Sequence, residues 1–144
     1  MKNFTVFLLF IVSGLKVSAQ NKDAIVGTWL TPKHDARIEI YKRGEAYFGK
    51  LVWFKEQTDA AGKPKTDIKN PDAALRNRPL LNLEFLKNFV YAGDNNWTNG
   101  EIYDAQSGKT YSSKISMTGN NQLNLRGYVG VSLFGRTEIW TRAR

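Results

Sequence analysis

The chain has 144 residues, of which 42% are hydrophobic, 12% aromatic and 24% charged, so its composition is that of a globular domain rather than of a disordered or collagen-like chain. It has no cysteine and one histidine, His34, which excludes a disulfide framework, a thiolate metal site, a cysteine nucleophile and a multi-histidine metal site. Its net charge is +8, but the basic residues are dispersed, so we expect no nucleic-acid partner.

The first residues predict export. Lys2 precedes an apolar run over residues 6–12, and Val17-Ser18-Ala19 has the small residues that a signal peptidase recognises. This run is too short to cross a membrane, which takes about 20 residues. We therefore interpret residues 1–19 as a signal peptide and residues 20–144 as one domain. The protein is expected in the periplasm or the extracellular space, without an integral membrane span.

The remaining chain predicts a meander of strands. Apolar residues recur with a period of two, and turn residues separate the segments about every 8–12 positions, which is typical of an all-β barrel or sandwich. Short links favour antiparallel neighbours. The expected strands span residues 25–31, 36–42, 45–55, 84–92, 97–104, 109–117, 122–129 and 135–143. The predicted fold class is all-β, a single eight-stranded antiparallel up-and-down barrel with one short helix in a long loop.

The long loop spans residues 56–79. Asn70, Pro71 and Asp72 have the order of an N-cap, a first helical residue and an acid at the positive helix end, so we predict a short helix over residues 70–77. A loop of this length at the rim of a barrel is either a lid or a structural plug, and the sequence leaves both open.

Alternation along the strands assigns side chains to the barrel interior. The residues expected inside are Ile38, Ile40, Phe48, Tyr111, Ser113, Ile115, Met117, Leu123, Leu125 and Gly127. The third strand is less clear, because both of its faces carry apolar residues. An eight-stranded barrel has either a filled core or room for one small ligand, and the sequence does not decide between them. The small residues Ser113 and Gly127 slightly favour a cavity.

Two short motifs lie at the ends of the predicted barrel, Gly27-Thr28-Trp29 in the first strand and Trp140-Thr141-Arg142 in the last. Together they resemble the calycin arrangement of lipocalins, fatty-acid-binding proteins and avidin-like barrels. The resemblance implies that an arginine of the last strand, Arg142 or Arg136, lies over Trp29 and closes one end of the barrel. Such a contact combines a cation–π interaction with hydrogen bonds to terminal carbonyl groups.

A second resemblance covers nearly the whole of the predicted domain. Besides Gly27–Trp29, its motifs are Phe48–Trp53, Asp67–Asp72, Arg78–Leu81, Gly100–Asp104, Ser107–Tyr111, Leu125–Tyr128 and Gly135–Arg142. In combination they are similar to the motifs of exported bacterial proteins with domain of unknown function 2147. The resemblance implies a small secreted calycin-like barrel and brings no established reaction or ligand. Asn82 and Ala105 depart from the expected glycine and proline without threatening the fold.

We predict no catalytic residue, no metal site and no cofactor. His34 lies in a turn, and no Gly-x-Ser-x-Gly motif supplies a serine for it to activate. A pair of carboxylates for glycoside hydrolysis would come from Glu39, Glu101, Asp104 and Glu138, but the sequence does not give their separation. The acids of the long loop alternate with lysines and lack the spacing of a calcium-binding loop.

The candidate ligand site combines polar residues of the long loop with aromatic and apolar residues of the barrel. The polar set is Asp67, Asn70, Arg76 and Arg78, and the others are Tyr103, Tyr111, Phe48 and Met117. The two arginines either bind an anionic group that enters the barrel or pair with loop acids and hold the loop. Both interpretations remain open.

The leading hypothesis is a non-enzymatic envelope protein that binds a small amphipathic molecule or lipid inside the barrel or at its mouth. One alternative is an interaction module with a filled barrel, whose outer aromatic residues Tyr47, Trp53 and Tyr128 contact an envelope protein or glycan. The other is an enzyme that acts on an exported substrate. The sequence does not predict the oligomeric state.

Overall fold

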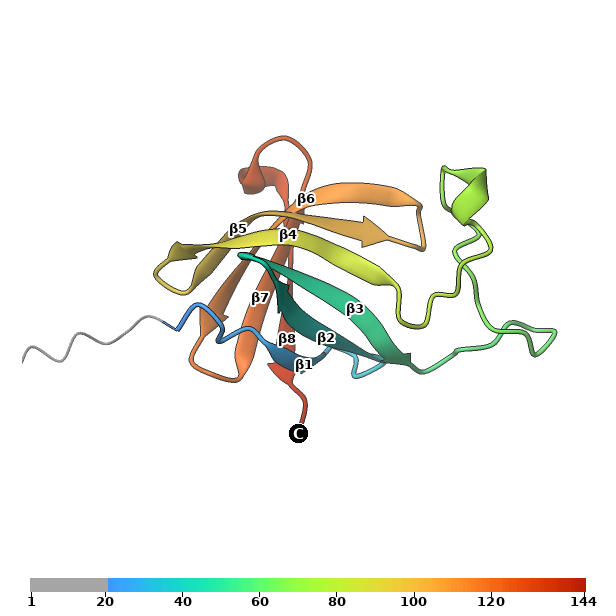
Figure 1. The fold of residues 1–144 in the computed structure, drawn as a ribbon, viewed down its shortest axis with the longest axis horizontal. Coiled ribbons are helices and arrows are strands. Elements are labelled where there is room, and N and C mark those ends of the chain that lie inside the picture. Colours follow the sequence, from blue (N-terminus) through green and yellow to red (C-terminus); the bar gives the residue numbers. More distant parts are fainter. Residues whose placement is uncertain (1–20) are drawn as a thin grey trace, which may run out of the picture.

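The structure is a computed structural model, and it describes residues 21–144; the predicted signal peptide, residues 1–19, lies outside the described residues. The strands are β1 (Gly27–Leu30), β2 (Ala36–Arg43), β3 (Ala46–Phe54), β4 (Glu84–Gly93), β5 (Asn96–Asp104), β6 (Lys109–Thr118), β7 (Gln122–Tyr128) and β8 (Arg136–Arg142). Each strand pairs antiparallel with the next, and β8 pairs with β1, so the sheet closes into a barrel (Figure 1). The predicted eight-stranded up-and-down barrel is confirmed.

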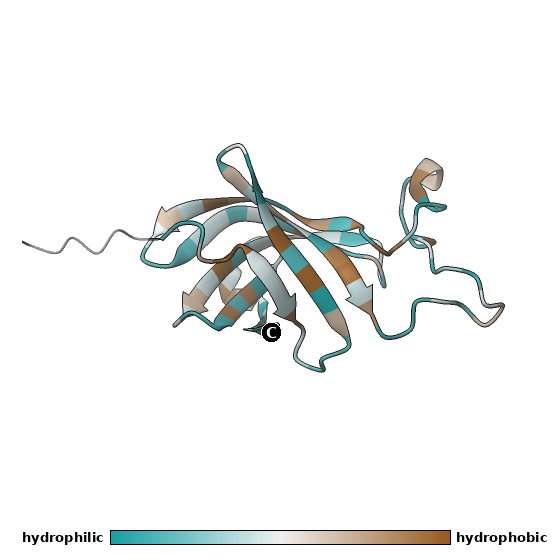
Figure 2. Cartoon of the chain, turned by 60° about the horizontal axis from the view of Figure 1, so that its bottom comes forward, coloured by the Kyte–Doolittle hydropathy of each residue, from teal (hydrophilic) through white to brown (hydrophobic). Residues whose placement is uncertain are grey.

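Apolar and polar residues alternate along several strands, as the bands of hydropathy in Figure 2 show. In β2, β6 and β7 this alternation places the apolar side chains inside the barrel. The core residues of these strands that are no more than 2% exposed are Ile38, Ile40, Ile115, Leu123 and Leu125. Ser113 is also buried, and its hydroxyl donates to the Arg126 carbonyl at 2.9 Å. The inward face predicted for these three strands is therefore confirmed.

In β3 the predicted faces are partly wrong. Tyr47 is 1% exposed and belongs to the core, so it is not an outer aromatic residue. Phe48 lies on the outer face, where its ring stacks on Tyr41 at 6.3 Å and the Arg43 guanidinium lies 3.8 Å from its centroid. Glu84 holds that guanidinium at 3.1 Å. Because this outer face is covered by aromatic and charged neighbours, both faces of β3 tolerate apolar residues.

Two asparagines break the alternation in β4 and β5. Asn88 and Asn99 have positive φ values, 64° and 61°, near the irregularities of strand pairing. As a result Leu86 and Phe89, three residues apart, both belong to the core. The Phe89 ring lies directly against Gly100, where an added Cβ would overlap the ring, so this position accepts no side chain.

One end of the barrel is closed by Trp29 and Arg142. Trp29 is fully buried, and the Arg142 guanidinium lies 4.3 Å from its ring centroid. This guanidinium also donates to the carbonyls of Asn120, Val26 and Ala24 at 2.9, 3.1 and 2.7 Å. The closure implied by the calycin resemblance is therefore present, and Arg142 makes it. Arg136 does not, since it lies six residues earlier on β8, about 20 Å along the strand.

The segment before β1 completes this closed end. The Trp97 indole donates to the Lys22 carbonyl at 3.0 Å, and the Tyr47 hydroxyl donates to the Asp23 carboxylate. The hydrogen bond from Tyr47 and the nearby charge of Lys42 lower the pKa of Asp23. Residues 22–26 thus cover the closed end of the barrel, where they accept hydrogen bonds from side chains of the core.

The prediction of a helix over residues 70–77 with Asn70 as its N-cap is wrong, both in the length of the helix and in the capping residue. The loop contains only a 3-10 turn, η1 (Ala73–Leu75), and the Asp72 carboxylate caps it by accepting from the Ala74 amide at 3.0 Å. A second 3-10 turn, η2 (Ser132–Phe134), lies between β7 and β8. Among residues 21–144, no helix has the length and apolar character that crossing a membrane requires.

Replacing Arg142 by lysine should destabilise the barrel by about 2–4 kcal/mol, because an ammonium group keeps the charge but cannot reach three carbonyls and the Trp29 face at once. Urea denaturation followed by tryptophan fluorescence measures this change. Arg144→Lys, at the exposed end of the chain, is the matched control. If the Arg142→Lys variant has wild-type stability, Arg142 does not hold the closure.

Candidate functional site

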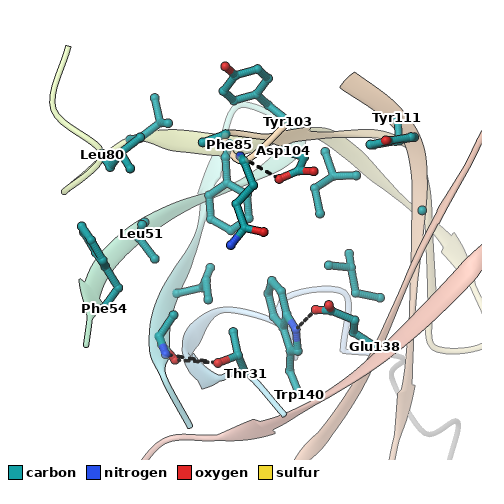
Figure 3. A pocket seen from close by; sticks show the side chains of 18 of the residues that line it. Thr31, Leu51, Phe54, Leu80, Phe85, Tyr103, Asp104, Tyr111, Glu138 and Trp140 are labelled. Atoms are coloured by element: carbon teal, nitrogen blue, oxygen red, sulfur yellow. Dashed lines mark hydrogen bonds between the residues drawn. The ribbon is translucent and has the colours of Figure 1, made fainter. Parts of the chain in front are cut away.

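A cavity of about 1040 Å³ occupies the barrel end opposite Trp29. It opens where β1, β3, β5 and β7 end and the intervening strands begin. Its apolar wall residues are Ile38, Leu51, Phe54, Leu80, Leu83, Phe85, Ile102, Tyr111, Leu125 and Trp140, most of which Figure 3 shows from close by. The barrel is therefore filled at its closed end and hollow at its open end.

Aromatic rings form the floor of the cavity. Trp140 is 2% exposed, and its ring centroid lies 6.5 Å from that of Phe85, with the two planes tilted by 47°. Gly127 faces the cavity from β7, where an added Cβ would meet only Ile102 at 3.6 Å and Tyr111 at 3.9 Å. The expectation that Gly127 leaves space inside the barrel is therefore confirmed.

Strand β8 brings two charged residues to the cavity. Its residues Arg136, Glu138 and Trp140 pair with Gly127, Leu125 and Leu123 of β7. Because directly paired residues share a face of the sheet, and those of β7 point inward, all three face the interior. Glu138 is half-buried and accepts a hydrogen bond from the Trp140 indole at 3.0 Å (Figure 3), whereas Arg136 is exposed at the mouth.

The long loop is anchored by a buried carboxylate outside the barrel. Asp67 is 1% exposed and accepts hydrogen bonds from the Tyr103 hydroxyl at 2.6 Å, from the Asn70 amide at 2.8 Å, and from Nε of Arg78 at 2.8 Å. Nη2 of Arg78 also lies 2.8 Å from Oδ2 of Asp67, so two nitrogens of this guanidinium contact the same carboxylate oxygen. The loop is thereby fixed to the outer face of β5.

These contacts keep Asp67 ionised in spite of its burial. Burial raises the pKa of this carboxyl, but the hydrogen bonds from Tyr103, Asn70 and Arg78 outweigh that effect and hold the pKa below its ordinary value. Conversely, burial and the bond to Asp67 raise the pKa of Tyr103. Asp67 and its partners therefore form a stable, charged structural cluster.

The two arginines predicted for the site, Arg76 and Arg78, hold the loop rather than face the space inside the barrel. Arg76 donates from Nε to the Asn70 carbonyl at 2.8 Å, and Arg78 is paired with Asp67. Tyr103 is among the residues that line the cavity, but its hydroxyl donates to Asp67 and points away from the space (Figure 3). The hydroxyl of Tyr103 and the two arginines are therefore already engaged in holding the loop.

Of the remaining candidate site residues, Tyr111 lines the cavity. Met117 belongs to the core of the closed half, and Phe48 lies on the outer face. Trp53 is 38% exposed and carries Arg37 over its ring at 5.7 Å, whereas Tyr128 lies at the cavity mouth. Only part of the predicted site is therefore assembled around one space.

The long loop extends one wall of the cavity mouth. It runs away from the barrel at the open end (Figure 1), and its residues Glu56 and Lys65 line the entrance together with the flanking residues Lys55 and Leu80. Its later half packs closely on the β5–β6 turn, where an added Cβ on Gly108 would overlap the Lys69 carbonyl oxygen. Gly108, with φ of +73°, is the residue that permits this approach.

Of the four carboxylates considered for catalysis, Asp104 and Glu138 line the same cavity. Glu138 faces the cavity, whereas Glu101 is exposed on the outer face of β5, so the barrel wall separates these two acids. His34 lies in the exposed turn before β2, as expected. No three histidine, aspartate or glutamate side chains within residues 21–144 gather into a group suited to a metal ion.

Comparison with known proteins identifies relatives of this fold. Residues 27–142 match the family described as "Uncharacterized protein conserved in bacteria (DUF2147)". The solved structure of HP1028 from Helicobacter pylori, described as belonging to the lipocalin family, is similar with a TM-score of 0.73 and 22% identity, over 83% of this chain and 82% of that one. No curated protein matches the chain. At this identity, the likeness to HP1028 shows a shared fold.

Replacing Asp67 by asparagine should loosen residues 66–80 by about 1–3 kcal/mol, because the half-exposed Arg78 loses its ionic partner. Hydrogen exchange should show faster exchange of the amides of Asn70, Arg78 and Leu80. Asp94→Asn, in an exposed hairpin turn, is the control.

The same anchor should respond to pH. Because the folded pKa of Asp67 is depressed, its stabilisation is complete above about pH 4 and is lost as the pH falls through the folded pKa. The Asp67→Asn substitution should remove this dependence from the loop amides. If the loop exchanges equally in both proteins across this range, Asp67 is not its anchor.

Proposed function

The chain belongs to the DUF2147 family of bacterial proteins, and we propose that it binds a small amphipathic molecule in the barrel cavity. The observation that carries this proposal is the cavity of about 1040 Å³ with its aromatic floor. Ligand cavities of proteins reach roughly this size and are mostly apolar with a few polar groups. The lipocalin-like fold supports the proposal, because eight-stranded barrels of this kind have room for one small ligand.

The distribution of residues in the cavity favours an amphipathic ligand. Its apolar part would pack against Trp140 and Phe85 at the floor. Its polar part would meet the charged residues of the wall, which are Glu138 inside the barrel and Lys55, Asp104 and Arg136 nearer the mouth. This proposal moves the polar contacts away from Arg76 and Arg78, because these arginines hold the loop.

Binding without catalysis is the function that these residues favour. The carboxylates of Glu101 and Glu138 lie on different sides of the barrel wall. Asp104 caps its own turn, accepting from the Gln106 amide at 3.0 Å and the Ser107 hydroxyl at 2.8 Å. An interaction module with a filled barrel is less favoured, because the open half of this barrel is hollow.

Narrowing the cavity at Gly127 should weaken binding in a graded way. N-phenyl-1-naphthylamine, a neutral apolar probe, should bind the wild-type protein with increased fluorescence. Gly127→Ala should change its affinity little, whereas Gly127→Val should lower it by about tenfold, because the larger side chain enters the space beside Tyr111 and Ile102.

Two observations complete this test. Circular dichroism and thermal melting show whether each Gly127 variant is folded. Native mass spectrometry and lipid extraction of protein purified from its own host should recover a bound small molecule. Absence of probe binding to the wild-type protein, together with no recovered molecule, would refute the proposed function.

We also propose that the protein acts outside the cytoplasm after removal of residues 1–19. The segment that covers the closed end of the barrel accepts its first hydrogen bonds at Lys22 and Asp23, so cleavage after Ala19 leaves these contacts in the mature chain. Mass analysis of the protein from an envelope or culture fraction should give a chain that begins at Gln20. A full-length chain recovered from the cytoplasmic fraction would contradict export.

A further inference from the structure

The acidic residue Glu138 has an unusual position in the cavity. Its backbone lies two residues, about 7 Å, from that of Trp140 along β8, and its half-buried side chain reaches the floor, where the carboxylate accepts from the Trp140 indole at 3.0 Å. Two other acids that line the cavity, Asp35 and Glu56, lie in loops at its rim, and Asp104 is the last residue of β5, where its carboxylate is held by the Gln106 amide and the Ser107 hydroxyl. Glu138 is thus the carboxylate that an entering ligand meets inside the barrel.

The carboxylates at the rim already have partners. Asp35 accepts from the Thr31 hydroxyl at 2.7 Å, and Glu56 pairs with Lys65 at 3.6 Å. Glu138 differs, because among the described residues the only hydrogen bond to its carboxylate is the one from the Trp140 indole to Oε2. A carboxylate accepts several hydrogen bonds, so Oε1 still has its capacity to bind a donor.

The nearby arginine does not neutralise this carboxylate. Arg136 precedes Glu138 by two residues on the same face of β8, but it is exposed at the mouth. No ion pair within 4.0 Å joins Glu138 to a basic residue anywhere in the described part of the chain. A negative charge among apolar walls without a counter-ion is costly, and a bound cation would offset that cost.

We propose that the ligand is an amphipathic amine, whose protonated nitrogen donates to Glu138 while its hydrocarbon or aromatic part packs on Trp140 and Phe85. This inference rests on the proposed function and names the chemical class of its ligand. The Trp140–Glu138 hydrogen bond holds the carboxylate and the floor in a fixed relation.

The same geometry disfavours an anionic amphiphile. A carboxylate head at the depth of Glu138 would place two negative charges side by side in an apolar space. With its head at Arg136 instead, such a molecule would lay its apolar tail against the charged Glu138 side chain, which desolvates the carboxylate without compensation. An amine avoids both costs.

Three single-chain compounds of equal length test the proposal: dodecylamine, dodecanol and dodecanoate, each below its micelle concentration. Each competes for the cavity with N-phenyl-1-naphthylamine at pH 7. We expect the amine to displace the probe at a concentration about tenfold or more below that of the alcohol, with dodecanoate the weakest. Glu138→Gln keeps an acceptor for the Trp140 indole and removes the charge, so it should abolish the advantage of the amine over the alcohol.

The control is Glu45→Gln, which removes the same charge from the exposed β2–β3 turn at the closed end, where the Glu45 side chain is 86% exposed. This variant should keep the wild-type order of the three compounds. If the wild-type protein binds the probe but the amine has no advantage, or if Glu138→Gln keeps that advantage, the assignment of Glu138 is wrong while the proposed function stands. If the wild-type protein does not bind the probe, the proposed function itself fails.

Discussion

The contact between Arg142 and Trp29 determines how the barrel is closed. One guanidinium covers a buried indole and binds carbonyls from the segment before β1 and from the β6–β7 turn, which are distant in the sequence. These bonds support the pairing of the last strand with the first, so every strand among residues 21–144 has a paired neighbour on both sides. Because this end is sealed and packed with large aromatic residues, the free space of the barrel lies at the other end, where a ligand can enter.

Much of the fold is predictable from the sequence, because its strands obey one simple constraint. Where one face of a strand is buried and the other is exposed to solvent, as in β6 and β7, the alternation of apolar and polar residues predicts both the position of the strand and which side chains point inward. The same logic fails in β3, whose outer face is covered by Tyr41 and Arg43 and tolerates Phe48 as well as the interior tolerates Tyr47. It also fails at Asn88, where a residue with positive φ shifts the phase of β4.

The site is less predictable, because chemical character alone does not show which group is already in use. Asp67 and Arg78 have the residue types of an anion site, yet they satisfy each other on the outer face of β5. Glu138, which faces the cavity, has no distinctive motif in the sequence. Its orientation follows from its pairing with Leu125 and from alternation with Trp140 and Arg142 along β8, but the sequence does not show that this face borders a free space rather than a filled core.

Closure and ligand chemistry are linked through β8, because this one strand carries both. Arg142 at its end lies over Trp29 and pairs with it across β8 and β1, while residues 136–141 pair with β7 in the same register. A slip of one residue would turn Trp140 and Glu138 to the outside and bring Thr137 and Ile139 to the cavity wall. The register that places Arg142 over Trp29 at the sealed end is therefore the one that turns Trp140 and the carboxylate of Glu138 into the cavity.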